Sequence, residues 1–230
     1  ISDAGTTRVS NRDIGGSVRC VLKTGNIQIR RMWRKVSVSH WILSEERRLP
    51  LHINLEIVHL QLTRRCNLHC AFCGQKHMES PDALQLSEWL ELLDRIHDYA
   101  PGAVLVLWGG EPLAYPYFRD IVLYAEKLSF PLEVITNGTL ADLHADLLRK
   151  YFRRIYLSVD GPERVHDAIR GKGVFAKIKE NLAFLGRIEG ELVMMSVMTP
   201  ENLDFFESLP FGLPADRVIL HELIYLTEKE

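Results

Sequence analysis

The chain has 230 residues, of which 47% are hydrophobic and 25% charged, and its formal net charge at pH 7 is -2. These proportions are near the average for globular proteins, and the length suffices for one substantial hydrophobic core. They argue against a nucleic-acid-binding protein, which would carry a basic excess, and no apolar run reaches the roughly 20 residues that a membrane helix needs. Because the first residues also lack the apolar core of a signal peptide, we expect a cytoplasmic protein without nucleic-acid or membrane contacts.

The N-terminal part of the chain predicts short strands. Val, Ile and aromatic residues gather in three runs separated by turn-forming or charged residues, and a charged stretch follows at residues 44–50. We expect residues 1–50 to form a small β-rich segment, separate from a main domain at 51–230. Cys20 lies in the first run, and we expect it to be a small buried side chain. The three runs are residues 18–22, 27–31 and 36–42.

From residue 56 onward, strand-like apolar runs alternate with segments of helical pattern. This alternation predicts parallel strands joined by right-handed helical crossovers. There are too few repeats for a closed eight-fold barrel, so we expect an α/β fold: a partial (β/α)6 TIM-like barrel, with a doubly wound open sheet as the alternative. In both folds, chemistry lies on loops that follow the C-terminal ends of the strands. The expected strands are 56–63, 103–108, 131–136, 154–160, 191–198 and 217–224.

Apolar side chains recur at helical spacing between these strands, and each stripe is expected to face the core. Ser87 precedes the first stripe as a candidate N-cap, and Thr139 is a candidate cap for the third helix. The stripes are Trp89, Leu92, Leu93 and Ile96; Phe118, Ile121, Val122 and Ala125; Leu143, Leu147 and Tyr151; and Ile178, Leu182 and Leu185.

Three of the four cysteines lie within eight residues, directly after the first strand of the main domain. A disulfide framework normally uses an even number of cysteines spread along a small secreted chain, so Cys66, Cys70 and Cys73 indicate metal or redox chemistry. Iron–sulfur clusters that only carry electrons usually have four cysteine ligands, whereas three leave one iron open to another molecule. The alternative is a zinc site completed by His69 or His77, although structural zinc sites usually separate two ligand pairs by a longer stretch.

The pattern Cys66-x3-Cys70-x2-Cys73, with Phe72 before the last cysteine, resembles the signature of the radical S-adenosylmethionine superfamily. Three further motifs follow the second, third and fourth strands in the order that this family uses. The resemblance covers residues 56–224. The motifs are Gly109-Gly110-Glu111-Pro112, Thr136-Asn137-Gly138 and Ser158-Val159-Asp160-Gly161-Pro162, the last continuing through His166-Asp167 and Arg170-Gly171.

The resemblance implies a [4Fe–4S] cluster held by the three cysteines, with S-adenosylmethionine bound at its open iron. It also implies a one-electron donor such as flavodoxin or ferredoxin, and cleavage to a 5′-deoxyadenosyl radical that abstracts hydrogen. Glu111 would accept from the amino group of S-adenosylmethionine, Ser158 would hydrogen-bond to it, and Arg170 could pair with its carboxylate. The residues expected around this cofactor are Phe72, Gly109, Gly110, Glu111, Thr136, Ser158, Asp160 and Arg170.

The stretch 158–171 most resembles the SPASM and sulfatase-maturase-like enzymes, which modify peptides or proteins. We therefore expect a peptide or protein substrate. Those enzymes continue into a cysteine-rich C-terminal region, whereas this sequence has no cysteine after Cys73. Three alternatives stay open: a radical enzyme acting on a cofactor or nucleotide precursor, a glycyl-radical activase, and a zinc-binding interaction module. His221 and Glu222 on the last strand are expected to be structural or solvent-facing.

Overall fold

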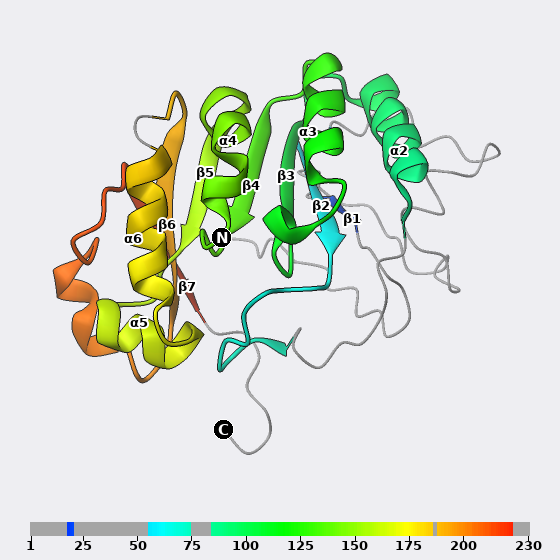
Figure 1. Ribbon diagram of the computed structural model, residues 1–230. Coiled ribbons are helices and arrows are strands. Elements are labelled where there is room, and N and C mark those ends of the chain that lie inside the picture. Colours follow the sequence, from blue (N-terminus) through cyan, green and yellow to red (C-terminus); the bar gives the residue numbers. More distant parts are fainter. Residues whose placement is uncertain (1–17, 21–54, 75–83, 186–187, 223–230) are drawn as a thin grey trace, which may run out of the picture.

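The computed structural model describes residues 18–20, 55–74, 84–185 and 188–222, which form one seven-stranded sheet (Figure 1). The strands follow one another across the sheet in sequence order, and β2 to β7 are parallel, whereas β1 pairs antiparallel with β2. They are β1 (Val18–Cys20), β2 (Ile57–Thr63), β3 (Val104–Gly109), β4 (Leu132–Thr136), β5 (Phe152–Ser158), β6 (Glu191–Met198) and β7 (Arg217–Glu222).

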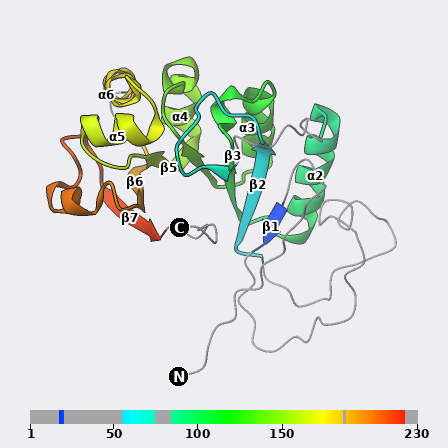
Figure 2. The same ribbon diagram turned by 90° about the horizontal axis from the view of Figure 1, so that it is seen from below.

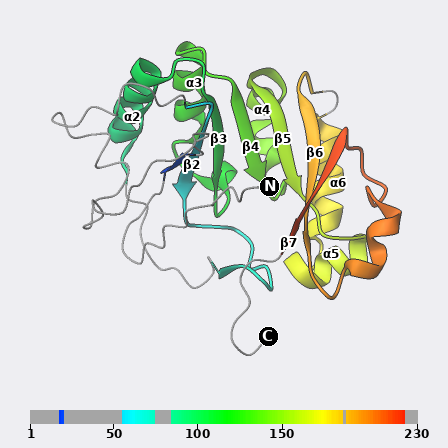
Figure 3. The same ribbon diagram turned by 180° about the vertical axis from the view of Figure 1, so that it is seen from behind.

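The helices alternate with these strands. Figures 1 and 3 show α2, α3, α4 and α6 on one face of the sheet, and in Figure 2 the strands follow an arc with these helices outside it. A doubly wound sheet would carry helices on both faces, so the expected partial (β/α)6 barrel is confirmed. The helices are α2 (Leu86–Tyr99), α3 (Phe118–Lys127), α4 (Ala145–Tyr151), α5 (Glu163–Arg170) and α6 (Val174–Leu185), with 3-10 turns η2 (Pro112–Ala114), η3 (Ala141–His144) and η4 (Leu203–Ser208).

The N-terminal segment contributes β1 to the edge of the sheet, within the first strand expected there. The strands expected at residues 27–31 and 36–42 lie outside the described residues. Each of the six strands expected in the main domain is present, with ends that differ by up to two residues where both are described. No helix among the described residues is long and apolar enough to cross a membrane.

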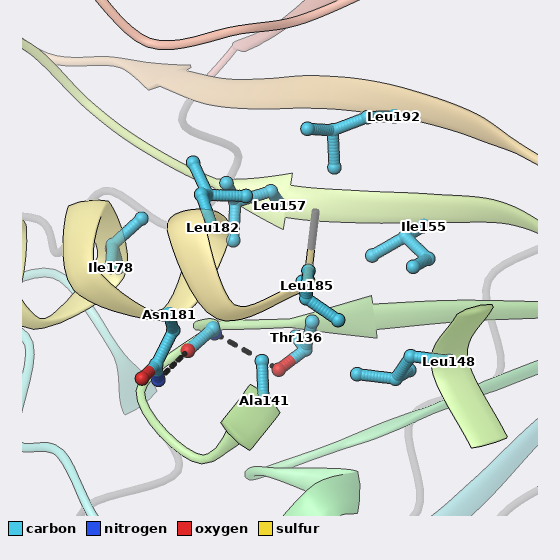
Figure 4. Close-up of a pocket in the computed structure, with 11 residues that line it drawn as sticks. Thr136, Ala141, Leu148, Ile155, Leu157, Ile178, Asn181, Leu182, Leu185 and Leu192 are labelled. Atoms are coloured by element: carbon cyan, nitrogen blue, oxygen red, sulfur yellow. Dashed lines mark hydrogen bonds between the residues drawn. The ribbon is translucent and has the colours of Figure 1, made fainter. Parts of the chain in front are cut away.

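The core lies between the sheet and its covering helices. Every second side chain of a strand points toward the helices; Leu60, Leu105 and Leu107 do so and are completely buried. The apolar stripes of α2 and α3 are buried as expected. Figure 4 shows the equivalent layer farther along the sheet, where Ile155 of β5 and Leu182 and Leu185 of α6 line an apolar pocket.

Three expectations about helices are wrong: those for Leu143 and Ser87, and that for Thr139 in the site described below. Leu143 is 66% exposed, because η3 precedes α4 and the helical spacing begins only at Ala145. Ser87 does not cap α2, because the helix begins at Leu86 and Gln85 is its N-cap. The Glu88 carboxylate accepts from the Gln85 backbone N–H at 2.7 Å, which satisfies one of the amide groups at this terminus.

The sheet face opposite the covering helices carries a ladder of charged side chains across three strands. Arg154 lies between two carboxylates, with Nη1 3.0 Å from Glu133 and Nε 2.6 Å from Glu191. The Tyr156 hydroxyl donates to Glu133 at 2.9 Å. Glu133 is 3% exposed, so these partners compensate the cost of removing its carboxylate from water.

Candidate functional site

The cysteine loop, residues 64–74, leaves the C-terminal end of β2 and lies at the same edge of the sheet as α5 (Figure 1). Cys70 is buried, Cys66 and Cys73 are half-buried, and all three thiols are free. The Leu68 N–H donates to Cys66 Sγ at 3.4 Å, and the Cys73 N–H donates to the Cys70 carbonyl at 3.1 Å. The Ala71 N–H donates to the Ile169 carbonyl oxygen of α5 at 2.8 Å, and this hydrogen bond connects the loop to that helix.

The three thiols influence one another electrostatically. Burial raises the pKa of the Cys66 thiol, against the hydrogen bond from Leu68, and charge on the other two thiols raises it further. Burial also raises the pKa of Cys70, partly offset by the Arg170 guanidinium. A neighbouring cation would favour ionisation of Cys66 and Cys70, which fits a loop whose ligands are to bind iron as thiolates.

The described residues contain no three Cys, His, Asp or Glu side chains grouped closely enough to hold a single metal ion. His69 lies exposed in the cysteine loop, and His77 lies outside the described residues. A four-iron cluster is larger than an ion, and three cysteines that bind it each contact a different iron. The donor set, three thiols with no fourth cysteine in the loop 64–74, fits such a cluster with one open iron.

Gly109 and Gly110 bring the end of β3 against the start of the cysteine loop. The Gly110 N–H donates to Thr63 O, and the Glu111 N–H donates to Arg65 O, both at 2.9 Å. Gly109 has φ +152°, and a Cβ on Gly110 would overlap the carbonyl oxygen of Arg65. In the structure these glycines allow close approach of the backbone to the cysteine loop, and their expected position beside S-adenosylmethionine stays a prediction.

Gly110→Ala is expected to displace the cysteine loop, because the new methyl group would meet backbone that cannot rotate away. We expect a loss of about 3 kcal/mol in the free energy of unfolding, at the upper end for overpacking, and a lower iron content after reconstitution. Gly74→Ala is the matched control, since it lies beside Cys73 but has no atom within 4 Å of the added Cβ. Urea unfolding and iron analysis of both variants test this, and equal behaviour would contradict it.

Glu111 joins the ends of β3 and β4. Its carboxylate is completely buried and accepts from Leu113 N at 3.1 Å, Thr136 Oγ1 at 2.7 Å and Asn137 N at 2.8 Å. Burial raises its pKa to about 6, against the stabilising effect of these hydrogen bonds on the charged form. Thr136, also buried, thus lies against Glu111, and both carboxylate oxygens have protein donors.

The turn after β4 contacts the cysteine loop through side chains. Asn137 Nδ2 lies 2.9 Å from Asn67 Oδ1 and 3.8 Å from Cys66 Sγ. Thr139 was expected to cap the third helix, but it does not. Its backbone N–H and its hydroxyl instead donate to Asn137 Oδ1 at 2.9 and 2.7 Å. From the other side, Asn181 Nδ2 of α6 donates to the Gly138 carbonyl at 2.8 Å (Figure 4). Sequence reasoning missed Asn67 and the Asn137 side chain.

Asp160 and Arg170 pair with each other beyond the end of β5. Arg170 Nε lies 2.5 Å from Asp160 Oδ2, and Asp160 is 0% and Arg170 9% exposed. The other carboxylate oxygen accepts from Val197 N at 2.9 Å. The Arg170 guanidinium lies 5.6 Å from the ring centroid of Phe72, in the cysteine loop. Phe72 and Ser158 are half-buried, whereas both carboxylate oxygens of Asp160 accept hydrogen bonds from protein groups.

His166 supports Asp160 from α5. Its ring is completely buried, Nδ1 accepts from the Asp160 N–H at 3.1 Å, and Nε2 has no partner among the described residues. This arrangement suits the neutral imidazole. Burial, followed by the charge of Arg170, lowers the pKa of His166 to about 4.

This pKa predicts acid sensitivity. The folded state resists protonation of His166, so stability is full above the ordinary value of 6.5 and is lost as the pH falls toward 4. Between pH 7.5 and 5.0 the free energy of unfolding of the wild-type apoprotein should fall by about 2 kcal/mol more than that of His166→Asn. The asparagine keeps an acceptor for the Asp160 N–H. Glu111 acts in the opposite sense, since its raised pKa lowers stability as the pH rises through about 6, but both proteins retain it. Urea unfolding at the two pH values measures the difference, and parallel losses would contradict the assignment.

A family model described as Radical SAM superfamily matches residues 60–209. A tungsten-containing aldehyde ferredoxin oxidoreductase cofactor-modifying protein from Pyrococcus furiosus is 26% identical over 195 residues, which cover 76% of this chain and 54% of that protein. The sporulation killing factor maturation protein SkfB from Bacillus subtilis is 28% identical over 149 residues, covering 63% of this chain and 36% of that protein. The chain thus matches about half or less of these relatives' lengths.

The fold has counterparts among solved structures. Streptococcus suis SuiB bound to S-adenosylmethionine superposes with a TM-score of 0.63 at 18% identity, over 76% of this chain and 42% of that one. At this identity the similarity shows a shared fold. The partial barrel described above is therefore shared with the matched 42% of that chain.

Proposed function

Because the chain belongs to the radical S-adenosylmethionine superfamily, we propose that it is an enzyme that binds a [4Fe–4S] cluster through Cys66, Cys70 and Cys73 and cleaves S-adenosylmethionine. When bound, the cluster supplies the electron that cleaves S-adenosylmethionine to a 5′-deoxyadenosyl radical, which abstracts hydrogen from a substrate. The observation that carries this proposal is the cysteine loop at the C-terminal end of β2, within the stretch that matches the family. A one-electron donor such as flavodoxin or ferredoxin would serve the reaction.

Burial divides the proposed cofactor residues into two groups. Phe72, Ser158 and the backbone of Gly109 and Gly110 are half-buried, and they can contact S-adenosylmethionine directly. The others are nearly or completely buried and bond to protein groups, so they hold the cysteine loop and the strand ends in position. These positioning residues are Glu111, Thr136, Asp160 and Arg170.

For the substrate we propose a peptide or protein. Two observations support this: the resemblance of residues 158–171 to peptide-modifying enzymes, and the similarity to a protein whose name is that of a killing-factor maturation protein. A small cofactor precursor is the second candidate, favoured by the similarity to a protein named as cofactor-modifying.

Reconstituting the chain anaerobically with iron and sulfide tests the proposed chemistry, with S-adenosylmethionine and dithionite as reactants. We expect close to four irons per chain and formation of 5′-deoxyadenosine. Deuterated peptide substrates should transfer deuterium into that product, whereas deuterated cofactor precursors should not. Zinc in place of iron, or no 5′-deoxyadenosine, would overturn the activity; deuterium from a cofactor precursor alone would overturn the peptide assignment.

A further inference from the structure

Three side chains beside the cysteine loop form a closed ring of hydrogen bonds. Asn67 Nδ2 donates to Thr139 Oγ1 at 2.8 Å, Thr139 Oγ1 donates to Asn137 Oδ1 at 2.7 Å, and Asn137 Nδ2 donates to Asn67 Oδ1 at 2.9 Å. Each group donates once and accepts once around the ring, so the three bonds polarise one another in the same direction. The ring joins the cysteine loop to the turn after β4.

The ring fixes which way the Asn137 amide points. Its oxygen accepts from both the backbone N–H and the hydroxyl of Thr139, so a flipped amide would place an NH2 group against the Thr139 N–H. The flipped oxygen would also face Asn67 Oδ1, another acceptor. Asn137 is 6% and Thr139 7% exposed, which limits competition from water.

One amide hydrogen of Asn137 is used in the ring, and the second is directed at the cysteine loop. Asn137 Nδ2 lies 3.8 Å from Cys66 Sγ, within hydrogen-bonding range for sulfur. The Leu68 N–H approaches the same sulfur at 3.4 Å. Cys66 therefore receives two N–H donors, one from its own loop and one from the turn after β4.

We propose that Asn137 is a positioning residue that donates to the Cys66 sulfur and raises the reduction potential of the cluster bound there, a role that rests on the proposed function. Reduction adds one electron, supplied by an external donor, to the cluster and its sulfur ligands. N–H donors stabilise this added negative charge, and hydrogen bonds to the sulfurs are among the determinants of cluster potential. The ring of Asn67, Asn137 and Thr139 holds the donor in place before reduction occurs.

The test compares two variants that introduce the same charge. Asn137→Asp removes the N–H directed at Cys66, whereas Asn67→Asp leaves it and places its carboxylate where Oδ1 now lies 4.0 Å from the sulfur. An EPR-monitored redox titration of the reconstituted proteins, without S-adenosylmethionine, gives each cluster potential. We expect the reduction equilibrium constant to be about tenfold lower in Asn137→Asp than in Asn67→Asp, which is about 59 mV for a one-electron couple.

A neutral variant keeps the proposal testable if a carboxylate prevents cluster binding. Thr139→Val retains both amides but removes the hydroxyl that orients Asn137, and its potential should fall in the same direction by a smaller amount. Iron content of the wild-type protein separates the two levels of inference: without a cluster, the proposed function itself fails. If the clusters assemble and the potentials of Asn137→Asp and Thr139→Val equal those of Asn67→Asp and wild type respectively, the role of Asn137 is overturned.

Discussion

Replacing Cys70 with alanine is expected to abolish cluster binding and cleavage of S-adenosylmethionine together. Cys70 is the most buried of the three thiols, and its carbonyl accepts the bond that forms the turn to Cys73. Its loss would leave only two protein ligands on the cluster. Removal even of groups that merely orient a ligand costs up to about 100-fold in metal affinity or activity, so removal of a ligand should exceed that.

The measurements are iron and sulfide content, visible absorbance, and 5′-deoxyadenosine formed with dithionite as reductant. Cys20→Ala is the control, because Cys20 lies in β1, outside the cysteine loop, and this variant should keep its cluster and activity. A Cys70→Ala protein that still forms 5′-deoxyadenosine would contradict the assignment of the cysteine loop.

The architecture was predictable because apolar runs are separated by helical stripes from β2 to β6, and one further apolar run gives β7. Strand ends carry the motifs, so their order along the chain also predicted that the cysteine loop, Glu111 and Asp160 would lie at one edge of the sheet. The errors have local causes. Leu143 was misplaced because hydrophobic spacing does not distinguish a 3-10 turn from the first turn of a helix.

The polar partners at this edge were less predictable. Arg170 pairs with Asp160, ten residues earlier, a partner that the sequence did not indicate, and its expected pairing with a ligand carboxylate stays a prediction. Asn67 and Asn137 are 70 residues apart, and no periodicity relates them. Hydrogen-bond partners of this kind depend on how two loops meet in space, whereas hydrophobic periodicity reports only which face of an element is buried.

Asp160→Asn is expected to destabilise the protein by about 3–5 kcal/mol, because it leaves the Arg170 charge buried without its partner. The amide keeps an oxygen that can accept from the Val197 N–H, so the loss isolates the charge. Asp146→Asn is the matched control: its partner Arg119 is 54% exposed and Asp146 58%, and exposed pairs contribute less than about 1 kcal/mol.

A double-mutant cycle separates the ion pair from general disruption of the strand ends. Arg170→Met removes the charge while keeping an apolar stem, and the double variant Asp160→Asn, Arg170→Met should be less destabilised than the sum of its single changes. Urea unfolding of the four proteins gives the coupling energy, and simple additivity would contradict a direct interaction. Helix α5 carries Arg170, and its Ile169 carbonyl accepts from the Ala71 N–H of the cysteine loop. Measuring the iron content of the same four proteins therefore shows how far this buried ion pair holds the cysteine loop in place.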